Sequence, residues 1–279
     1  MSSRPLLWKG YEGMRKLLLT NIGMLATPQG RAAKKGTEQG AIQMLKNAWV
    51  LVEDGVIAQV GTGAAPEVED AKVVDAEGNL VTPGLVDAHT HLIFGGWRQN
   101  ELGMKLHGKT YLEIQNAGGG IQSTTNATRQ ATAEELTNKA AKALDEMMGF
   151  GVTTCEAKSG YGLATEHELK ALQVIKDLND RHPMDIVAPF MGAHLVPAEY
   201  KQNREESIRL VCEEMIPAVK EQGIAKFCDV FCEADTFTVE ESRQVLEAGL
   251  KYGLRPKIHA DEIEAIGGSQ LAGEIGAIS

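Results

Sequence analysis

The sequence lacks the marks of a membrane-spanning, disulfide-stabilised or nucleic-acid-binding protein. It has no window of about 18 apolar residues, because its best early candidate, residues 17–25, is interrupted by polar residues and a glycine. Its four cysteines, Cys155, Cys212, Cys228 and Cys232, include no Cys-x-x-Cys pair, which argues against a zinc ribbon or a redox motif. Acidic residues outnumber basic ones by 38 to 28, so the chain would repel nucleic acid and anionic membranes.

What is present describes an ordinary globular protein. Hydrophobic residues make up 43% of the chain and charged residues 24%, as is usual for soluble proteins. A length of 279 residues fits one large domain or two small ones. Since the sequence shows neither a signal peptide nor a membrane span, we expect a cytoplasmic protein with buried free thiols. The sequence leaves open whether the chain forms a homodimer.

The first 80 residues indicate a small β domain. Two short apolar runs, residues 48–52 and 56–60, flank Asp54-Gly55, and an Asp-Gly pair between such runs is typical of a β-hairpin. Shorter runs follow at residues 73–76 and 79–81. We therefore expect residues 1–80 to contain an N-terminal extension of about fifteen residues and part of a small β-sandwich.

Beyond residue 81 apolar runs alternate with amphipathic stretches, which predicts repeated βα units. The expected strands are residues 84–91, 152–156, 185–191, 227–232 and 255–259. The expected helices are residues 133–148, 165–180, 203–221 and 238–252.

Two architectures fit this alternation. A closed (β/α)₈ barrel takes about 250 residues, whereas residues 81–279 supply five strands and the start of a sixth at residues 276–278. We expect an incomplete TIM-like barrel containing the first five to six strands. The alternative is an open doubly wound sheet, but its glycine-rich phosphate turn after the first strand is absent. The run Gly118-Gly119-Gly120 follows a loop instead.

Four of the seven histidines follow the ends of predicted strands. His89 and His91 stand two residues apart, so on a strand both point to one face and can bind one metal ion. His194 and His259 follow later strands, and barrel active sites lie at such strand ends. The other three histidines lie in helices or loops and are expected to have no role in the site.

This pattern predicts hydrolysis by a metal-activated water. A metal with three protein ligands keeps a position open and lowers the pKa of bound water to about 7. Glu262 is the expected proton carrier, and Asp261 could share the face of His259. His194 could polarise a carbonyl or accept a proton. Arg98 lies in a polar loop and suits a substrate carboxylate.

Two neighbouring residues allow further interpretations. Lys158 lies at a strand end, where a carbamylated lysine could bridge two metals, and we treat this as the minority case. Tyr161 lies in the glycine-containing loop that follows, which could close over a substrate.

The run from Pro83 to His91 resembles the first-strand motif of the amidohydrolase superfamily. Four further runs resemble the imidazolonepropionase family within it, namely residues 94–101, 156–163, 192–194 and 259–262. The resemblance implies zinc- or iron-dependent hydrolysis of 4-imidazolone-5-propanoate to N-formimidoyl-L-glutamate, a step of histidine degradation.

Carried over by position, the resemblance implies roles for individual residues. The implied metal ligands are His89, His91 and His259. The implied substrate-binding residues are Arg98, Tyr161, His194 and Glu262, with Tyr111 as a further candidate. Glu262 and His194 would be the catalytic residues, and Lys158 would not be a metal bridge. The family also has an aspartate ligand on an eighth strand, which would lie beyond Ser279, so we expect a chain truncated at its C-terminus.

Three functions therefore remain open. The first is the metal-dependent cyclic amide hydrolase described above. The second is another amidohydrolase, a deaminase or a different cyclic amide hydrolase, because few residues speak to the substrate. The third is a truncated, inactive chain that serves as a binding module.

Overall fold

The computed structural model describes residues 15–30, 32–110, 113–114 and 117–279. The chain divides into two compact units, Met1–Leu85 and Val86–Ser279, which are described separately. Within these ranges no helix is long and apolar enough to cross a membrane.

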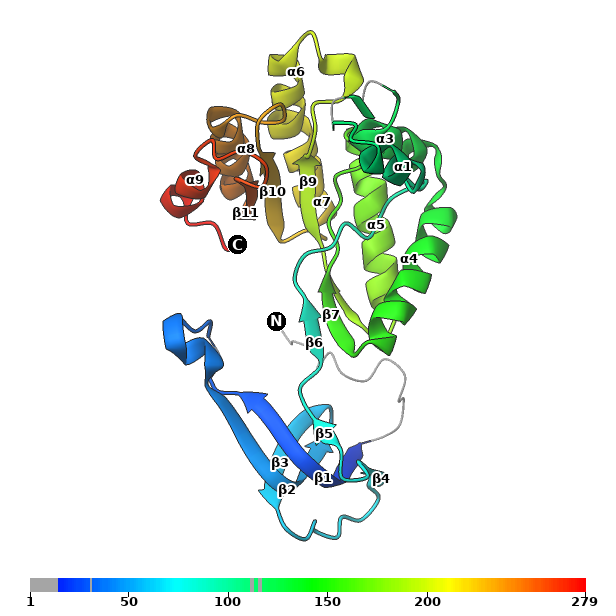
Figure 1. The fold of residues 1–279 in the computed structure, drawn as a ribbon, viewed down its shortest axis with the longest axis vertical. Helices are drawn as coiled ribbons and strands as arrows, with labels where there is room; N and C mark the ends of the chain where they lie inside the picture. The colour runs from blue at the N-terminus through cyan, green and yellow to red at the C-terminus, as the bar shows by residue number, and fades with distance from the viewer. Residues whose placement is uncertain (1–14, 31, 111–112, 115–116) are drawn as a thin grey trace. The chain divides into compact units, whose positions relative to one another are not determined.

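The first unit contains one five-stranded sheet (Figure 1). Its strands are β1 (Lys16–Pro28), β2 (Ile42–Glu53), β3 (Val56–Thr62), β4 (Lys72–Asp75) and β5 (Leu80–Val81). The order is β3-β2-β1-β4, and β5 also pairs with β1. A short 3₁₀ helix, η1 (Gly36–Gly40), lies between β1 and β2. The sheet agrees with the β character expected from the sequence, while the β-sandwich stays a prediction.

The hairpin between β2 and β3 turns at the predicted Asp54-Gly55 pair. Both residues have positive φ, 48° and 80°, as the two central positions of a type I′ turn require. One face of the sheet buries Ile22, Ala48 and Val50, because alternate residues of a strand point to the same side.

The second unit contains two three-stranded sheets. They are β6-β7-β8 and β9-β10-β11, and the pairs β7–β8, β9–β10 and β10–β11 are parallel. The strands are β6 (Leu85–Asp87), β7 (Val152–Glu156), β8 (Asp185–Val187), β9 (Pro189–Ala193), β10 (Phe227–Cys232) and β11 (Arg255–Ala260). Only Ala188 separates β8 from β9, so one segment of chain joins the two sheets.

The spatial order of these strands follows their order in the sequence. A doubly wound sheet reverses its strand order at a switch point, and the described strands show no such reversal. Beyond β11 the chain extends the same arrangement, because the Ile278 amide donates to the Pro256 carbonyl at 2.9 Å and the Ile258 amide to the Ser279 carbonyl at 3.1 Å.

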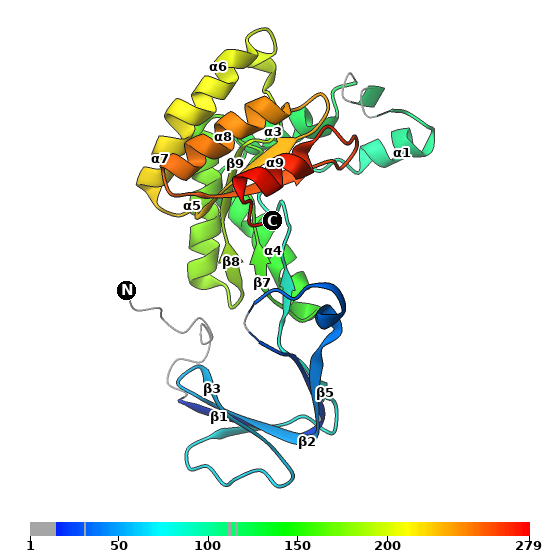
Figure 2. The same cartoon turned by 90° about the vertical axis from the view of Figure 1, so that its left-hand side faces the viewer.

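Helices accompany the strands as the alternation predicted. They are α1 (Asn100–Leu106), α3 (Gly120–Gln130), α4 (Ala133–Gly149), α5 (Thr165–Arg181), α6 (Arg204–Arg209), α7 (Ile216–Gln222), α8 (Val239–Lys251) and α9 (Gly268–Ile275). A 3₁₀ turn, η2 (Ala198–Tyr200), precedes α6. Helix α4 packs on β7, α5 on β8, α8 on β10 and α9 on β11 (Figures 1 and 2).

Three sequence expectations need correction. The single strand expected at residues 185–191 is two strands, β8 and β9, which belong to different sheets. The strand expected at residues 84–91 ends at Asp87, where the Asp87 carboxylate accepts a hydrogen bond from the His89 amide at 3.3 Å and so turns the backbone away from a regular ladder. The helix expected at 203–221 is interrupted by a π-helical segment, η3 (Leu210–Met215). Pro217 follows it and has no amide hydrogen, so the regular α-helical bond to residue 213 cannot form.

Candidate active site

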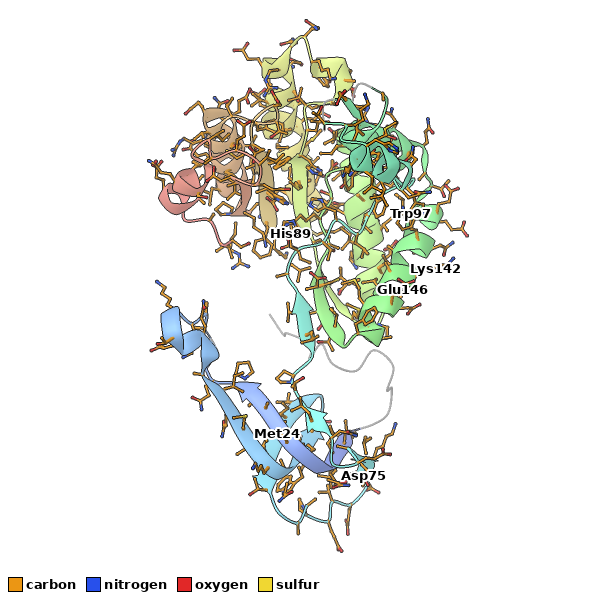
Figure 3. The ribbon with its side chains drawn as sticks, viewed as in Figure 1. Met24, Asp75, His89, Trp97, Lys142 and Glu146 are labelled. Atoms are coloured by element: carbon orange, nitrogen blue, oxygen red, sulfur yellow. The ribbon has the colours of Figure 1, made fainter. Side chains whose placement is uncertain are left out.

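The predicted site residues of the second unit line one cavity of about 540 Å³. The residues from the sequence analysis that line it are His89, His91, Arg98, Tyr161, His194, His259 and Glu262. They lie at or beyond the carboxyl ends of strands β6, β7, β9 and β11, with His259 as the penultimate residue of β11, and His89 lies where the chain leaves β6 (Figure 3). Tyr111 lies outside the described residues. Lys105, Ile121 and Phe231 also line the cavity and were not singled out from the sequence.

Three imidazoles converge in this cavity. The Nε2 atom of His259 lies 2.9 Å from Nε2 of His89 and 3.3 Å from Nε2 of His91. Tetrahedral zinc bound by nitrogens at about 2.0–2.1 Å has neighbouring ligand atoms about 3.3 Å apart. Among the described residues, these three form the one group of this kind with ligand atoms mutually within 4.8 Å.

The tautomer of His259 supports a cation at this point. Its Nδ1 atom lies 3.0 Å from Oδ1 of the buried Asp229. An ionised carboxylate only accepts hydrogen bonds, so Nδ1 carries the proton and, in the neutral ring, Nε2 presents its lone pair to the other two imidazoles. The Nε2 atoms of His89 and His91 lie within hydrogen-bond distance of this atom, and when all three rings present lone pairs here, a metal ion at their centre relieves the repulsion between them. The carboxylate behind a histidine ligand is a common arrangement in metal sites.

Asp229 belongs to a buried network of charges. Its Oδ2 atom accepts from Lys158 Nζ at 2.7 Å, and Lys158 also pairs with Glu156, which pairs with Lys257. Burial alone would raise the pKa of the Asp229 carboxyl, but His259 and Lys158 lower this pKa to about 2. Lys158 is thus held as an ion-paired ammonium outside the histidine cluster. This arrangement speaks against the metal-bridging interpretation of Lys158.

Three histidines of the cavity, His89, His91 and His194, are neutral near pH 7. Burial lowers the pKa of His91 to about 2 and that of His194 to about 4, and it also lowers the pKa of His89. Neutral imidazole is the form that binds metal ions. His89 and His91 are therefore available as metal ligands at neutral pH.

His194 lies against the cluster with its orientation fixed by the backbone. Its Nδ1 atom lies 2.8 Å from the Gly160 carbonyl oxygen, which only accepts, so Nδ1 is the donor and Nε2 is left as an acceptor in the neutral ring. The His194 ring stacks on His91 with centroids 4.9 Å apart and lies 5.0 Å from the Tyr161 ring.

The polar rim of the cavity carries charges of both signs. Arg98 and Lys105 supply positive charge, and Asp235, Glu262 and Glu264 supply negative charge. The Arg98 Nε atom lies 3.8 Å from Oε1 of the buried Glu101. A guanidinium held on one side by a carboxylate keeps further donors for a ligand.

Buried carboxylates hold the loops that bear these side chains. Glu101 accepts from the Gly120 amide at 2.7 Å. Glu233 accepts from three successive amides of the loop after β11, those of Glu262, Ile263 and Glu264, at 2.8–3.0 Å. Sequence reasoning missed both carboxylates, because their partners are backbone groups distant in the sequence.

Asp261 does not share the face of His259, which the sequence analysis had considered. Its carboxylate accepts from four amides at the start of α9, including those of Gly268 and Ser269 at 3.2 and 3.0 Å. It therefore turns away from the face of His259 and fixes the loop from residue 261 to residue 269.

Comparison with known proteins gives consistent results. The family model for the amidohydrolase family matches residues 72–110. Imidazolonepropionase of Geobacillus sp. (strain WCH70) is 50% identical over 274 residues, covering 95% of this chain and 65% of the relative. The enzyme of the same name from Alkaliphilus metalliredigens (strain QYMF) is 49% identical over 271 residues, covering 95% and 64%. The chain thus spans a little under two thirds of the length of these relatives.

Solved structures share the fold at low sequence identity. A 5-methylcytosine deaminase from Klebsiella pneumoniae liganded with 5-fluorocytosine matches with a TM-score of 0.62 and 18% identity, covering 93% of this chain and 55% of that one. A Xaa-Pro dipeptidase matches with a TM-score of 0.60 and 14% identity, covering 94% and 60%. These similarities concern the fold alone.

Proposed function

We propose that this chain, which is 50% identical to an imidazolonepropionase over 95% of its own length, carries the site for hydrolysis of 4-imidazolone-5-propanoate to N-formimidoyl-L-glutamate in histidine degradation. The observation that carries the proposal is the convergence of three Nε2 atoms beside Arg98, His194 and Glu262 in one cavity. The chain spans 65% of its relative, and the strands of the second unit would form the first part of a (β/α)₈ barrel over residues 81–279. The cytoplasmic location stays a prediction.

His89, His91 and His259 would hold one metal ion, zinc or iron. When bound, such an ion supplies Lewis acidity and makes hydroxide available at neutral pH. Imidazole nitrogens suit both zinc and iron, so the donor set alone leaves the choice between them to measurement. The carboxylate of Asp229 would keep His259 in the tautomer that presents Nε2.

Arg98 would fix the substrate through its propanoate group. A guanidinium pairs with a carboxylate through two parallel hydrogen bonds, and Glu101 holds Arg98 from behind. Lys105 lines the same cavity and adds a second positive charge. Tyr161, whose ring lies 5.7 Å from that of His91, would donate or accept a hydrogen bond at the ring of the substrate.

Glu262 would move the proton that hydrolysis requires. Its carboxylate takes a proton from the attacking water and returns it to the ring nitrogen as the amide C–N bond breaks. His194 has Nδ1 bound to Gly160, so in the neutral ring Nε2 accepts a hydrogen bond from a substrate N–H or from water. The sequence left open whether His194 polarises a carbonyl or accepts a proton, and an accepting Nε2 favours the second role.

A turnover assay with matched variants tests this proposal. The purified chain with added Zn²⁺ or Fe²⁺ is expected to consume imidazolone propanoate, with Glu262→Gln reducing kcat by about 100-fold or more. Arg98→Ala is expected to raise KM, since it removes a contact made to a part of the substrate that does not react. Metal binding without turnover of this substrate would overturn the proposal. Turnover of another cyclic amide or of an aminated ring would favour the second function, and no turnover of any would favour the third.

A further inference from the structure

We propose that Glu168 is a positioning residue, which fixes the tautomer of His194 and the place of Tyr161 through the backbone of residues 159–163. Its significance for catalysis rests on the proposed function, whereas its effect on His194 does not. Glu168 lies on α5, one turn into the helix, and is fully buried. It lies outside the cavity lining and outside every role considered above.

The Glu168 carboxylate binds the site loop with both of its oxygens. Oε2 accepts from the Gly160 amide at 2.9 Å, and Oε1 accepts from the amides of Gly162 and Leu163, each at 2.8 Å. The Ser159 hydroxyl is a further hydrogen-bond partner of this side chain. Burial raises the pKa of the carboxyl, and these hydrogen bonds oppose the rise. Both oxygens act here as acceptors, a pattern that an amide side chain cannot reproduce.

The loop takes a backbone path that needs such support. Gly160 has φ of +112°, and Leu163, a residue with a side chain, has φ of +50°. Conformations of this kind persist where the surrounding structure fixes them, and they cluster at functional sites. A Cβ atom at Gly160 would lie 2.9 Å from the Met191 carbonyl oxygen and 3.2 Å from Nδ1 of His194. The loop therefore lies in direct contact with His194, without room for a side chain.

The same loop carries both the carbonyl that binds His194 and the side chain of Tyr161. The Gly160 amide is bound by Glu168, and the carbonyl of this residue accepts the hydrogen bond from His194 Nδ1 at 2.8 Å. Tyr161 lies between the two amides that Glu168 anchors at Gly160 and Gly162. Any displacement of the anchored amides therefore moves the acceptor of His194 and the base of the Tyr161 side chain together.

The alternative is that Glu168 serves only to start α5. An acidic side chain in the first turn favours a helix through the helix dipole, but Glu166 already occupies such a position. The hydrogen bonds of the Glu168 carboxylate instead go to residues 159–163. The two roles differ in what they predict for His194, so a measurement on that ring separates them.

The test is the tautomer of His194, read from imidazole ¹⁵N chemical shifts of the full chain labelled with ¹⁵N-histidine, with and without Zn²⁺. The His194 signals are assigned by their loss in His194→Asn. In the unsubstituted chain we expect the tautomer with hydrogen on Nδ1. In Glu168→Gln an amide nitrogen, which donates, replaces one of the two accepting oxygens. We therefore expect at least about a tenth of the His194 rings to carry the proton on Nε2.

Glu135→Gln is the matched control. Glu135 also accepts backbone and hydroxyl hydrogen bonds, from Thr132 in the capping box of α4, but it is exposed and does not line the cavity. We expect it to leave the His194 signals unchanged. Glu168→Asp provides a second variant should Glu168→Gln fail to fold: it keeps two accepting oxygens but is shorter by one methylene, so it too should shift the His194 signals.

A folded Glu168→Gln or Glu168→Asp chain with unchanged His194 signals would overturn the inference, whatever the activity. Where the chain turns over imidazolone propanoate, we further expect Glu168→Gln to lower kcat at least 10-fold with a smaller change in KM, and to alter the pH profile. A chain that shows the tautomer change but no turnover would contradict the proposed function and leave this inference standing.

Discussion

The two units of the molecule differ in what they bury. The buried residues of the described part of the first unit are apolar, as in the cluster of Ile22, Leu25, Ala48 and Val50. The second unit buries a large apolar core and, in addition, the charged side chains Glu101, Glu156, Lys158, Glu168, Asp229, Glu233 and Lys257.

Burying charge is costly unless each group finds a partner. In the second unit the partners are residues and loops of the cavity: Asp229 binds His259, Glu168 binds the loop of Tyr161, and Glu233 binds the loop of Glu262. Apolar alternation is enough to make a sheet, whereas fixed positions for reactive side chains are obtained here with buried charges.

The largest expected effect comes from breaking the charge network of the second unit. Lys158→Met leaves Glu156 and Asp229 without their shared ammonium, so we expect a loss of about 3–5 kcal/mol in the free energy of unfolding. Urea unfolding followed by circular dichroism measures it. Arg15→Met removes the guanidinium from the exposed Arg15–Asp54 pair of the first unit and should leave stability unchanged. Equal effects of the two variants would refute the contrast between the units.

A smaller effect is expected from a steric change confined to the first unit. A Cβ atom at Gly23 would lie 2.0 Å from the Gly78 carbonyl oxygen, so Gly23→Ala forces the backbone apart and should cost about 1–3 kcal/mol. Gly40→Ala is the control, since nothing lies within 4 Å of its Cβ position. We expect Trp49, which lies on β2, to report the loss by fluorescence while metal binding stays unchanged. Weakened metal binding in Gly23→Ala would show that the two units are not independent.

The smallest effect concerns the thiols, all four of which lie in the second unit. Burial raises the pKa of Cys155 to about 12 and that of Cys212 to about 11, so both are protonated and unreactive at pH 8. A thiol reagent should therefore titrate less than one thiol per folded chain at pH 8 and four after unfolding. Gly23→Ala should not increase the reaction. Rapid modification of more than one thiol of the folded chain would contradict the burial of Cys155, Cys228 and Cys232.

Much of the fold could be predicted from the apolar pattern. The strands at residues 152–156 and 227–232 have the predicted bounds, and the helices predicted at 133–148 and 165–180 each end one residue later. Periodicity is a local property, so it is visible in the sequence. The early end of β6 and the π-helical segment depend on single hydrogen bonds and on one proline, which periodicity does not report.

The candidate site could be predicted only in part. Histidines at strand ends were visible because the carboxyl ends of parallel strands meet, and the cavity brings them together. The residues that hold these side chains in place could not be predicted. In the sequence Asp229 is one polar residue within an apolar strand, and Glu168 is one acid among several on a helix. Their partners lie 30 and 5–8 residues away, and pairings of this kind are set by the tertiary fold.

The metal content of the purified chain tests the central claim most directly. Elemental analysis after dialysis against Zn²⁺ should give about one metal ion per chain, and His91→Ala, which removes one of three converging ligands, should give close to none. His107→Ala is the control, because His107 is exposed and lies outside the cavity. Equal metal content in the His91→Ala and unsubstituted chains would contradict the account of the three histidines as a metal site.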